Sequence, residues 1–212
     1  EMMTGVSETV LINDDVAVED SSYTTGRRGV AATVIVEKIV GSLAETGGSL
    51  KECKILGDKV NRNSGSMGVA FSSCTVPAAG KPTFKLGPDE MEVGVGIHGE
   101  PGRRRDKVQP AQEITNELLG AIIEDLKLEN NGEILLFVNG MGGTPLTELY
   151  LLYDNAKKTL DNKNIKIARS LVGNYCTSLE MQGASLTITK LDQELKKHWD
   201  SPVHTAAMRW GL

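Results

Sequence analysis

The hydrophobic positions of this 212-residue chain follow a helical period in several stretches. In one of them Ser49 and Glu52 form a capping box, which marks the start of a helix. In another, Thr144 is expected as the N-cap, with Pro145 at the first helical position. The sequence predicts helices over residues 28–44, 49–61, 110–127, 144–160 and 191–199.

Between these stretches lie short apolar runs that are typical of strands. Residues 91–97 alternate between apolar and small or charged residues, as expected for a strand with one buried face. Residues 134–138 are apolar throughout, which indicates a strand covered on both faces. Strands are predicted over 9–18, 67–74, 91–97, 134–138, 165–172 and 184–190, and a loop over 98–109. The alternation predicts an α/β fold, a mixed sheet of about five to six strands covered mainly on one side by helices.

The first apolar run begins only eight residues into the sequence, at Thr9. A buried strand there needs neighbours. Residues 1–26 are therefore interpreted as the last strand and linker of a largely missing N-terminal domain, and residues 27–212 as a C-terminal α/β domain. An edge strand of the domain that follows is the alternative.

Composition narrows the class of protein. The formal net charge of −5 argues against nucleic acid as the main partner, and 40% hydrophobic residues exclude overall disorder. No apolar run reaches the roughly 18 residues that cross a bilayer, and no signal peptide is visible. The cysteines, Cys53, Cys74 and Cys176, form no CxxC pair and are expected to be reduced thiols in a cytoplasmic protein.

His98 is the strongest candidate for chemistry. It follows a predicted strand, in Gly94–Gly102, whose neighbouring residues lack bulk and let a ligand approach the ring and the backbone. Gly94 and Gly96 weaken the strand, which often marks close approach of a ligand or of another chain segment. A loop histidine bonded to nearby backbone is the alternative.

Other candidates are weaker. His198 is expected to face solvent, His204 lies in the tail, and the histidines show no metal-binding spacing, so no metal site is predicted. The glycine-rich turn 140–143 before a helix could hold an anion, but without a lysine it is no nucleotide loop, and a tight turn is the simpler interpretation. Arg103–Arg105 could bind a phosphate or an acidic partner, or simply be solvated.

Several motifs together resemble one family. They are Asp14–Val18, Thr25–Ala31, Ser66–Ala70, Cys74–Pro77, Gly94–Gly102, Asn139–Gly143, Thr177–Leu179 and Ser201–His204. This set resembles the dihydroxyacetone kinase family in its substrate-binding (K) part. The His-Gly-Glu-Pro-Gly segment is the most specific piece, and the resemblance covers essentially the whole chain.

The resemblance implies a fold and a site. The family has two α/β domains, and this chain is similar to the last strand of the first and to all of the second. By resemblance, Nε2 of His98 forms a covalent hemiaminal with dihydroxyacetone, and Gly96 and Gly99 lie against that substrate. The family's N-terminal segment supplies most substrate hydrogen bonds and the acid and base groups. The chain alone is therefore expected to be inactive and to hold substrate poorly.

The resemblance also implies partners. The separate-subunit form of the family works with an ADP-carrying L subunit and, indirectly, a phosphoenolpyruvate-fed phosphocarrier of the phosphotransferase system. No cofactor is then expected on this chain, because ADP or ATP and magnesium sit on the L subunit. A homodimer acting in glycerol metabolism is expected, with no membrane or nucleic acid partner. A non-catalytic, dihydroxyacetone-binding coactivator of transcription is the alternative.

Overall fold

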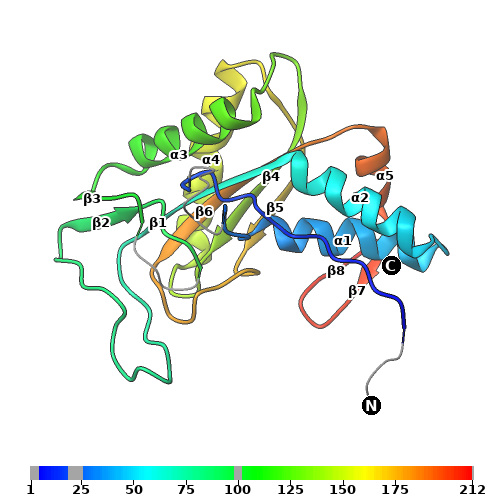
Figure 1. The fold of residues 1–212 in the computed structure, drawn as a ribbon. Coiled ribbons are helices and arrows are strands. Elements are labelled where there is room, and N and C mark those ends of the chain that lie inside the picture. The colour runs from blue at the N-terminus through cyan, green and yellow to red at the C-terminus, as the bar shows by residue number, and fades with distance from the viewer. Residues whose placement is uncertain (1–4, 19–25, 98–101, 212) are drawn as a thin grey trace.

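The computed structural model describes residues 5–18, 26–97 and 102–211. Its centre is a six-stranded mixed sheet with the order β3-β2-β1-β6-β4-β5 (Figure 1). The strands are β1 (Ser64–Ala70), β2 (Glu90–Val93), β3 (Arg104–Lys107), β4 (Glu133–Gly140), β5 (Lys166–Gly173) and β6 (Gly183–Lys190). The helices are α1 (Ala32–Glu45), α2 (Leu50–Arg62), α3 (Ala111–Leu126), α4 (Leu146–Asn162) and α5 (Gln193–Asp200).

Strand pairing makes the sheet mixed. β4 and β5 run parallel, whereas β1–β2, β1–β6, β2–β3 and β4–β6 pair antiparallel. β6 and β4 are interior strands of the sheet, and nearly all of their residues are buried. The predicted α/β class and the mixed sheet are therefore confirmed.

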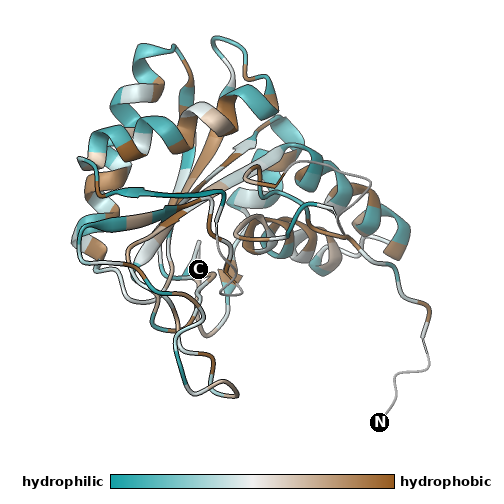
Figure 2. Ribbon diagram, turned by 60° about the vertical axis from the view of Figure 1, so that its left-hand side comes forward, coloured by the Kyte–Doolittle hydropathy of each residue, from teal (hydrophilic) through white to brown (hydrophobic). Residues whose placement is uncertain are grey.

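Helices cover both faces of this sheet. On β4, Ile134, Leu136 and Val138 belong to one apolar core with residues of α3 and α4. The intervening Leu135 and Phe137 belong to another core, with residues of α1, α2 and α5. Figure 2 shows the two groups of helices on either side of the apolar centre of the sheet. The expectation of cover mainly on one side is wrong, because a strand that is apolar at every position must bury both faces.

Two predicted helix starts, at Ser49 and Thr144, rest on capping residues, and the structure bears out the first. The capping box is confirmed: Ser49 N donates to Glu52 Oε2 at 2.8 Å, and Ser49 Oγ accepts from Glu52 N. α4 instead begins one residue later than predicted, with Pro145 as the N-cap. Thr144 does not cap it, because its hydroxyl bonds to both the N–H and the C=O of Gly183 on β6.

Two strand predictions fail. Residues 9–18 form no strand; their contact with the sheet is an isolated parallel bridge between Asp15 and Ser66. The predicted loop 98–109 contains β3, whose sequence Arg-Arg-Asp-Lys has no apolar face to reveal it because it is a largely exposed edge strand. The tail adds a short hairpin of β7 (Val203–His204) and β8 (Arg209–Trp210). The division of the chain into domains near residue 26 stays a prediction.

Candidate functional site

The predicted substrate anchor, His98, falls between β2 and β3 in the sequence. His98 and Gly99 lie outside the described residues, so the site is described from the segments on either side of them. At the start of the connection between β2 and β3, Gly94 N donates to Gly68 O at 2.7 Å, and at its end Arg103 N donates to Val93 O at 2.8 Å. The two ends of the loop are thus held side by side at the sheet.

Glycines allow this closure. Gly94 has φ +78°, a region that favours glycine, and a Cβ there would lie 2.8 Å from the Cβ of Ala17. A Cβ on Gly102 would lie 2.3 Å from the carbonyl oxygen of Val93. The prediction that glycines here mark the close approach of another chain segment is confirmed for Gly94, which lies against Ala17.

Gly96 is approached by a charged side chain. A Cβ at Gly96 would lie 3.0 Å from both Cζ and Nη1 of Arg28, so the guanidinium lies directly against the backbone of residue 96. Nη2 of Arg28 also donates to the carbonyl oxygen of Gly94 at 2.9 Å. A cation therefore supports the segment two residues before His98.

Asp15 holds that cation in place. Its Oδ2 accepts from Nε of Arg28 at 2.7 Å, and its Oδ1 accepts from Ala17 N at 3.0 Å. The Asp15 side chain is 2% exposed and that of Arg28 18%, so the pair is largely shielded from water. Burial raises the pKa of Asp15, while the charge of Arg28 works in the opposite direction.

Asp14 ties the same segment to α1 and to the sheet. Its carboxylate accepts from the backbone N–H groups of Val30 and Ala32 at 2.8 and 2.9 Å, and from the hydroxyl of Ser66 on β1. No side chain of α1 itself caps the helix, so Asp14 supplies the acceptor and the negative charge at this end. Burial raises the pKa of Asp14, and these hydrogen bonds oppose the rise.

The segments 14–18 and 25–31 contribute to the family resemblance, but the sequence analysis assigned no role to Asp14, Asp15 or Arg28. A usable signal was present. Two adjacent acidic residues follow Asn13 in a short polar stretch between apolar runs that end at Ile12 and resume at Val16. Buried carboxylates need partners, so that pattern predicts a paired arginine or capped amides nearby.

The other histidines lie away from this loop. The prediction that His198 faces solvent is wrong: it is buried on α5, and its Nδ1 lies 3.1 Å from Ser42 Oγ. Burial lowers the pKa of His198, so the neutral ring is favoured. His204 is exposed on β7.

The two candidate anion sites have protein partners. In the glycine turn, Met141 N and Gly143 N donate to carbonyls of the 181–183 segment, and Gly142 N donates to Asn174 Oδ1, which favours a structural turn. In the arginine run, Arg104 bonds to Glu117 and Arg105 bonds to Glu92. These contacts favour salt-bridged residues on an edge strand over a phosphate site.

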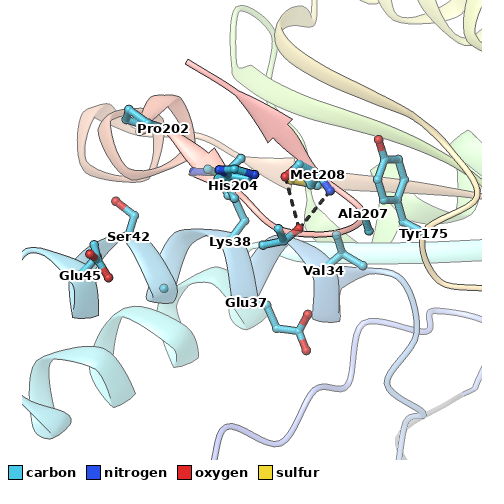
Figure 3. Close-up of a pocket in the computed structure, with 13 residues that line it drawn as sticks. Val34, Glu37, Lys38, Ser42, Glu45, Tyr175, Pro202, His204, Ala207 and Met208 are labelled. Atoms are coloured by element: carbon cyan, nitrogen blue, oxygen red, sulfur yellow. Dashed lines mark hydrogen bonds between the residues drawn. The ribbon is translucent and has the colours of Figure 1, made fainter. Parts of the chain in front are cut away.

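A hollow of about 680 Å³ lies between α1 and the β7–β8 hairpin (Figure 3). Lys38, which lines it, donates to the carbonyls of His198 and Ser201. The ammonium group of Lys38 thus joins α1 to the end of α5 and to Ser201, and it is already engaged with protein acceptors. Within residues 5–18, 26–97 and 102–211, no cluster of three or more potential metal ligands occurs, and no helix is long and apolar enough to cross a membrane.

Comparison with known proteins gives the family. Residues 2–207 match the Dak1 domain, and a Listeria innocua protein, the dihydroxyacetone-binding subunit DhaK of a PTS-dependent dihydroxyacetone kinase, is 50% identical over 187 residues. That match covers 88% of this chain and 57% of the relative. The chain therefore belongs to the Dak1 domain family, and the predicted membership in the dihydroxyacetone kinase family is confirmed.

Solved structures agree with this membership. A dihydroxyacetone kinase operon co-activator, DhaQ, superposes with a TM-score of 0.84 at 32% identity, covering 91% of this chain and 60% of that one. The dihydroxyacetone kinase of C. freundii superposes with a TM-score of 0.76 at 28% identity, covering 92% of this chain and 35% of that one. Against three bacterial curated relatives, the chain spans 57–64% of their length.

Proposed function

We propose that this chain is the part of a PTS-dependent dihydroxyacetone kinase that carries the ketone-anchoring histidine. The observation that carries the proposal is its 50% identity to a dihydroxyacetone-binding subunit, and the His-Gly-Glu-Pro-Gly loop, whose flanking residues bond to ion pairs with buried carboxylates, is consistent with it. His98 is the proposed covalent anchor, and Gly96 and Gly99 are the proposed neighbours of the substrate. The chain's substrate is dihydroxyacetone.

The chemistry of the anchor is a simple addition. The lone pair on Nε2 of neutral His98 attacks the carbonyl carbon and forms one N–C bond. The π electrons of the carbonyl move to its oxygen, which takes up a proton, while the ring loses the proton of Nδ1. Nothing leaves, so the hemiaminal can dissociate again. A polyol such as glycerol has no carbonyl and is rejected, and a three-carbon ketone is fixed in one pose.

The test uses dihydroxyacetone labelled with ¹³C at its carbonyl. In the intact protein a hemiaminal moves that resonance from the ketone region to the region of saturated carbons, and His98→Ala abolishes the shifted signal. His204→Ala is the matched control, because His204 is exposed and lies on the β7–β8 hairpin. His198 is no such control, since it is buried and bonded to Ser42. A shifted signal that survives in His98→Ala would refute the proposal.

The adduct also has an expected pH dependence. An unperturbed histidine has a pKa of about 6.5, so below about pH 6 protonation removes the nucleophilic lone pair and the shifted signal decreases. His98→Asn is titrated in the same way. Because its amide cannot add to the ketone, any weak binding that remains should give no shifted resonance.

A coactivator of transcription is the second candidate. The structural match to the co-activator DhaQ favours it, whereas the higher identity to the kinase subunit favours the kinase. The two are separated by mixing the intact protein with an L-type subunit, its phosphocarriers and phosphoenolpyruvate. Formation of dihydroxyacetone phosphate supports the kinase, and an adduct without phosphoryl transfer supports the coactivator.

The proposed partners follow from the kinase assignment. ADP or ATP and magnesium reside on the L subunit, the phosphocarrier acts through that subunit, and the complex works in the cytoplasm in glycerol metabolism. The intact protein is proposed to be a homodimer, because open sheet edges such as β3 need covering. Light scattering at micromolar concentration tests this, and a monomer mass at every concentration would contradict it.

A further inference from the structure

The loop that carries His98 is held at each end by a carboxylate–arginine pair. At its start, Arg28 is fixed by Asp15 and donates to the carbonyl of Gly94. At its end, Glu92 pairs with Arg105, and its Oε1 accepts from the N–H of Gly102 at 3.0 Å. Each pair thus makes a direct hydrogen bond to the loop backbone.

In both pairs the carboxylate is almost completely buried. The side chain of Asp15 is 2% exposed and that of Glu92 6%. A buried carboxylate is stable only when its partners are in place, so each pair has a narrow choice of geometry. The planar guanidinium of Arg28 adds a second constraint, because it lies against Gly96, where any side chain would displace it.

We propose that Arg28 and Glu92 are positioning residues that clamp the two ends of the loop, at Gly94 and Gly102, and so support the covalent capture of the ketone by His98. This rests on the proposed function of His98. The clamp acts on the backbone of Gly94 and Gly102, and its purpose is the alignment that a covalent addition needs. The N–C bond of the adduct needs the same alignment of nucleophile and carbonyl carbon as the attack does, so a loosened clamp weakens the adduct without unfolding the protein.

The central variant is Arg28→Lys, which keeps the charge but loses the planar group that bonds to Asp15 and Gly94 together. Arg27→Lys is the matched control. Arg27 is the neighbouring residue, and it forms an ion pair with Asp125 on α3. Glu92→Gln tests the other end of the loop. Gly96→Ala adds a methyl group that presses on the guanidinium of Arg28, while Asp15 and Arg28 themselves are not substituted.

Three readouts are taken on each intact variant: the ¹³C adduct population against dihydroxyacetone concentration, the thermal unfolding midpoint, and hydrogen exchange of the amides at 91–97 without substrate. We expect Arg28→Lys, Glu92→Gln and Gly96→Ala to weaken adduct formation about tenfold or more, and Arg27→Lys to change it less than about twofold. Exchange at 91–97 should increase in Arg28→Lys and not in Arg27→Lys.

The outcomes separate the two proposals. If the wild-type protein forms no adduct, the proposed function fails, and the exchange measurement still decides whether Arg28 fixes the loop. An adduct as strong in folded Arg28→Lys and Gly96→Ala as in wild type overturns the clamp. Equal losses in Arg28→Lys and Arg27→Lys also overturn it, because they assign the effect to general stability. Unchanged exchange at 91–97 in Arg28→Lys overturns it as well.

Discussion

Asp14 shows how one buried carboxylate joins three parts of the chain. It accepts hydrogen bonds from the amides of Val30 and Ala32 and from the hydroxyl of Ser66. We expect Asp14→Ala to lower the free energy of unfolding by about 3 kcal/mol, because two buried N–H groups lose their acceptor. Asp14→Asn keeps one acceptor and should lose less. Urea unfolding measures both.

The control for Asp14 is Asp58→Ala. Asp58 forms a partly exposed ion pair with Lys54 one turn away on α2, and such a pair contributes about 0.5 kcal/mol. A loss at Asp14 no larger than the loss at Asp58 would contradict the role assigned to Asp14.

Cys176 is expected to be chemically inert in the folded protein. Burial, followed by the charges of Asp14 and Glu37, raises the pKa of its thiol to about 11. At pH 8 only about one thiol in a thousand is then ionised, and the thiolate is the species that alkylates. Iodoacetamide should therefore label Cys176 about a hundredfold more slowly in the folded protein than in urea. Peptide mapping measures the rate, and equal rates in both states would exclude the shift.

At the scale of the residue, the close approach of other segments to Gly94 and Gly96 was predictable from the sequence, the role of His98 stays a prediction, and the ion pairs beside them were not predicted. Gly94 and Gly96 were interpretable because a missing side chain is itself a signal of close approach. The adjacent Asp14 and Asp15 signal a charged partner, but the contact of Arg28 with Gly94 was not predictable, because it joins residues 66 positions apart.

At the scale of the element, Glu133 joins the centre of the sheet to its edge and to α5. It lies at the start of β4 and pairs with Lys166 on β5 and Lys196 on α5. Hydrogen bonds from these lysines, Lys166 first, lower the pKa of Glu133 from 4.5 to about 2. Because the folded pKa lies below the unfolded one, the ionised carboxylate stabilises the fold above about pH 4.5 and loses this effect as the pH falls toward about 2.

Glu133→Gln should consequently unfold at lower urea concentration than wild type near neutral pH, and the difference should shrink between about pH 4.5 and pH 2. Glu129→Gln, in the exposed turn after α3, is the control, and its difference should stay small throughout. A gap between Glu133→Gln and wild type that does not depend on pH would refute the assignment.

Elements with strong local signals were predictable and polar ones were not. The helices show apolar periodicity and, at Ser49 or Asp192, caps whose side chains bond the first turn, so their positions agree with the structure within a few residues. The exposed strand β3 has neither signal. Residues 9–12 carry the apolar pattern of a strand yet form none, and Val10 and Ile12 instead pack against the core that contains α1 and α2. Tertiary packing overrides the pattern there.

At the scale of the molecule, the apolar interior strands of the sheet and its β1–β2–β3 side have different roles. The apolar centre, β4 and β6, is enclosed by helices on both faces and supplies stability. The β1–β2–β3 side carries the glycine-rich loop and the ion pairs that hold its ends. The proposed covalent capture of a small ketone needs a loop whose base is rigid, and these ion pairs hold that base in place.

The same division predicts that phosphoryl transfer needs a partner. The sequence has no GxxxxGK[ST] loop, and the amides of the nearest glycine turn, Met141–Gly143, donate to protein acceptors. We expect the purified protein, given ATP, magnesium and dihydroxyacetone, to form no dihydroxyacetone phosphate above background, while the ¹³C adduct still forms on the intact protein. Adding an L-type subunit loaded with nucleotide to the intact protein should start turnover, and His98→Ala should lower that turnover sharply, because the ketone is no longer held. Robust product formation from ATP without the L subunit would contradict the assignment of nucleotide and magnesium to the partner.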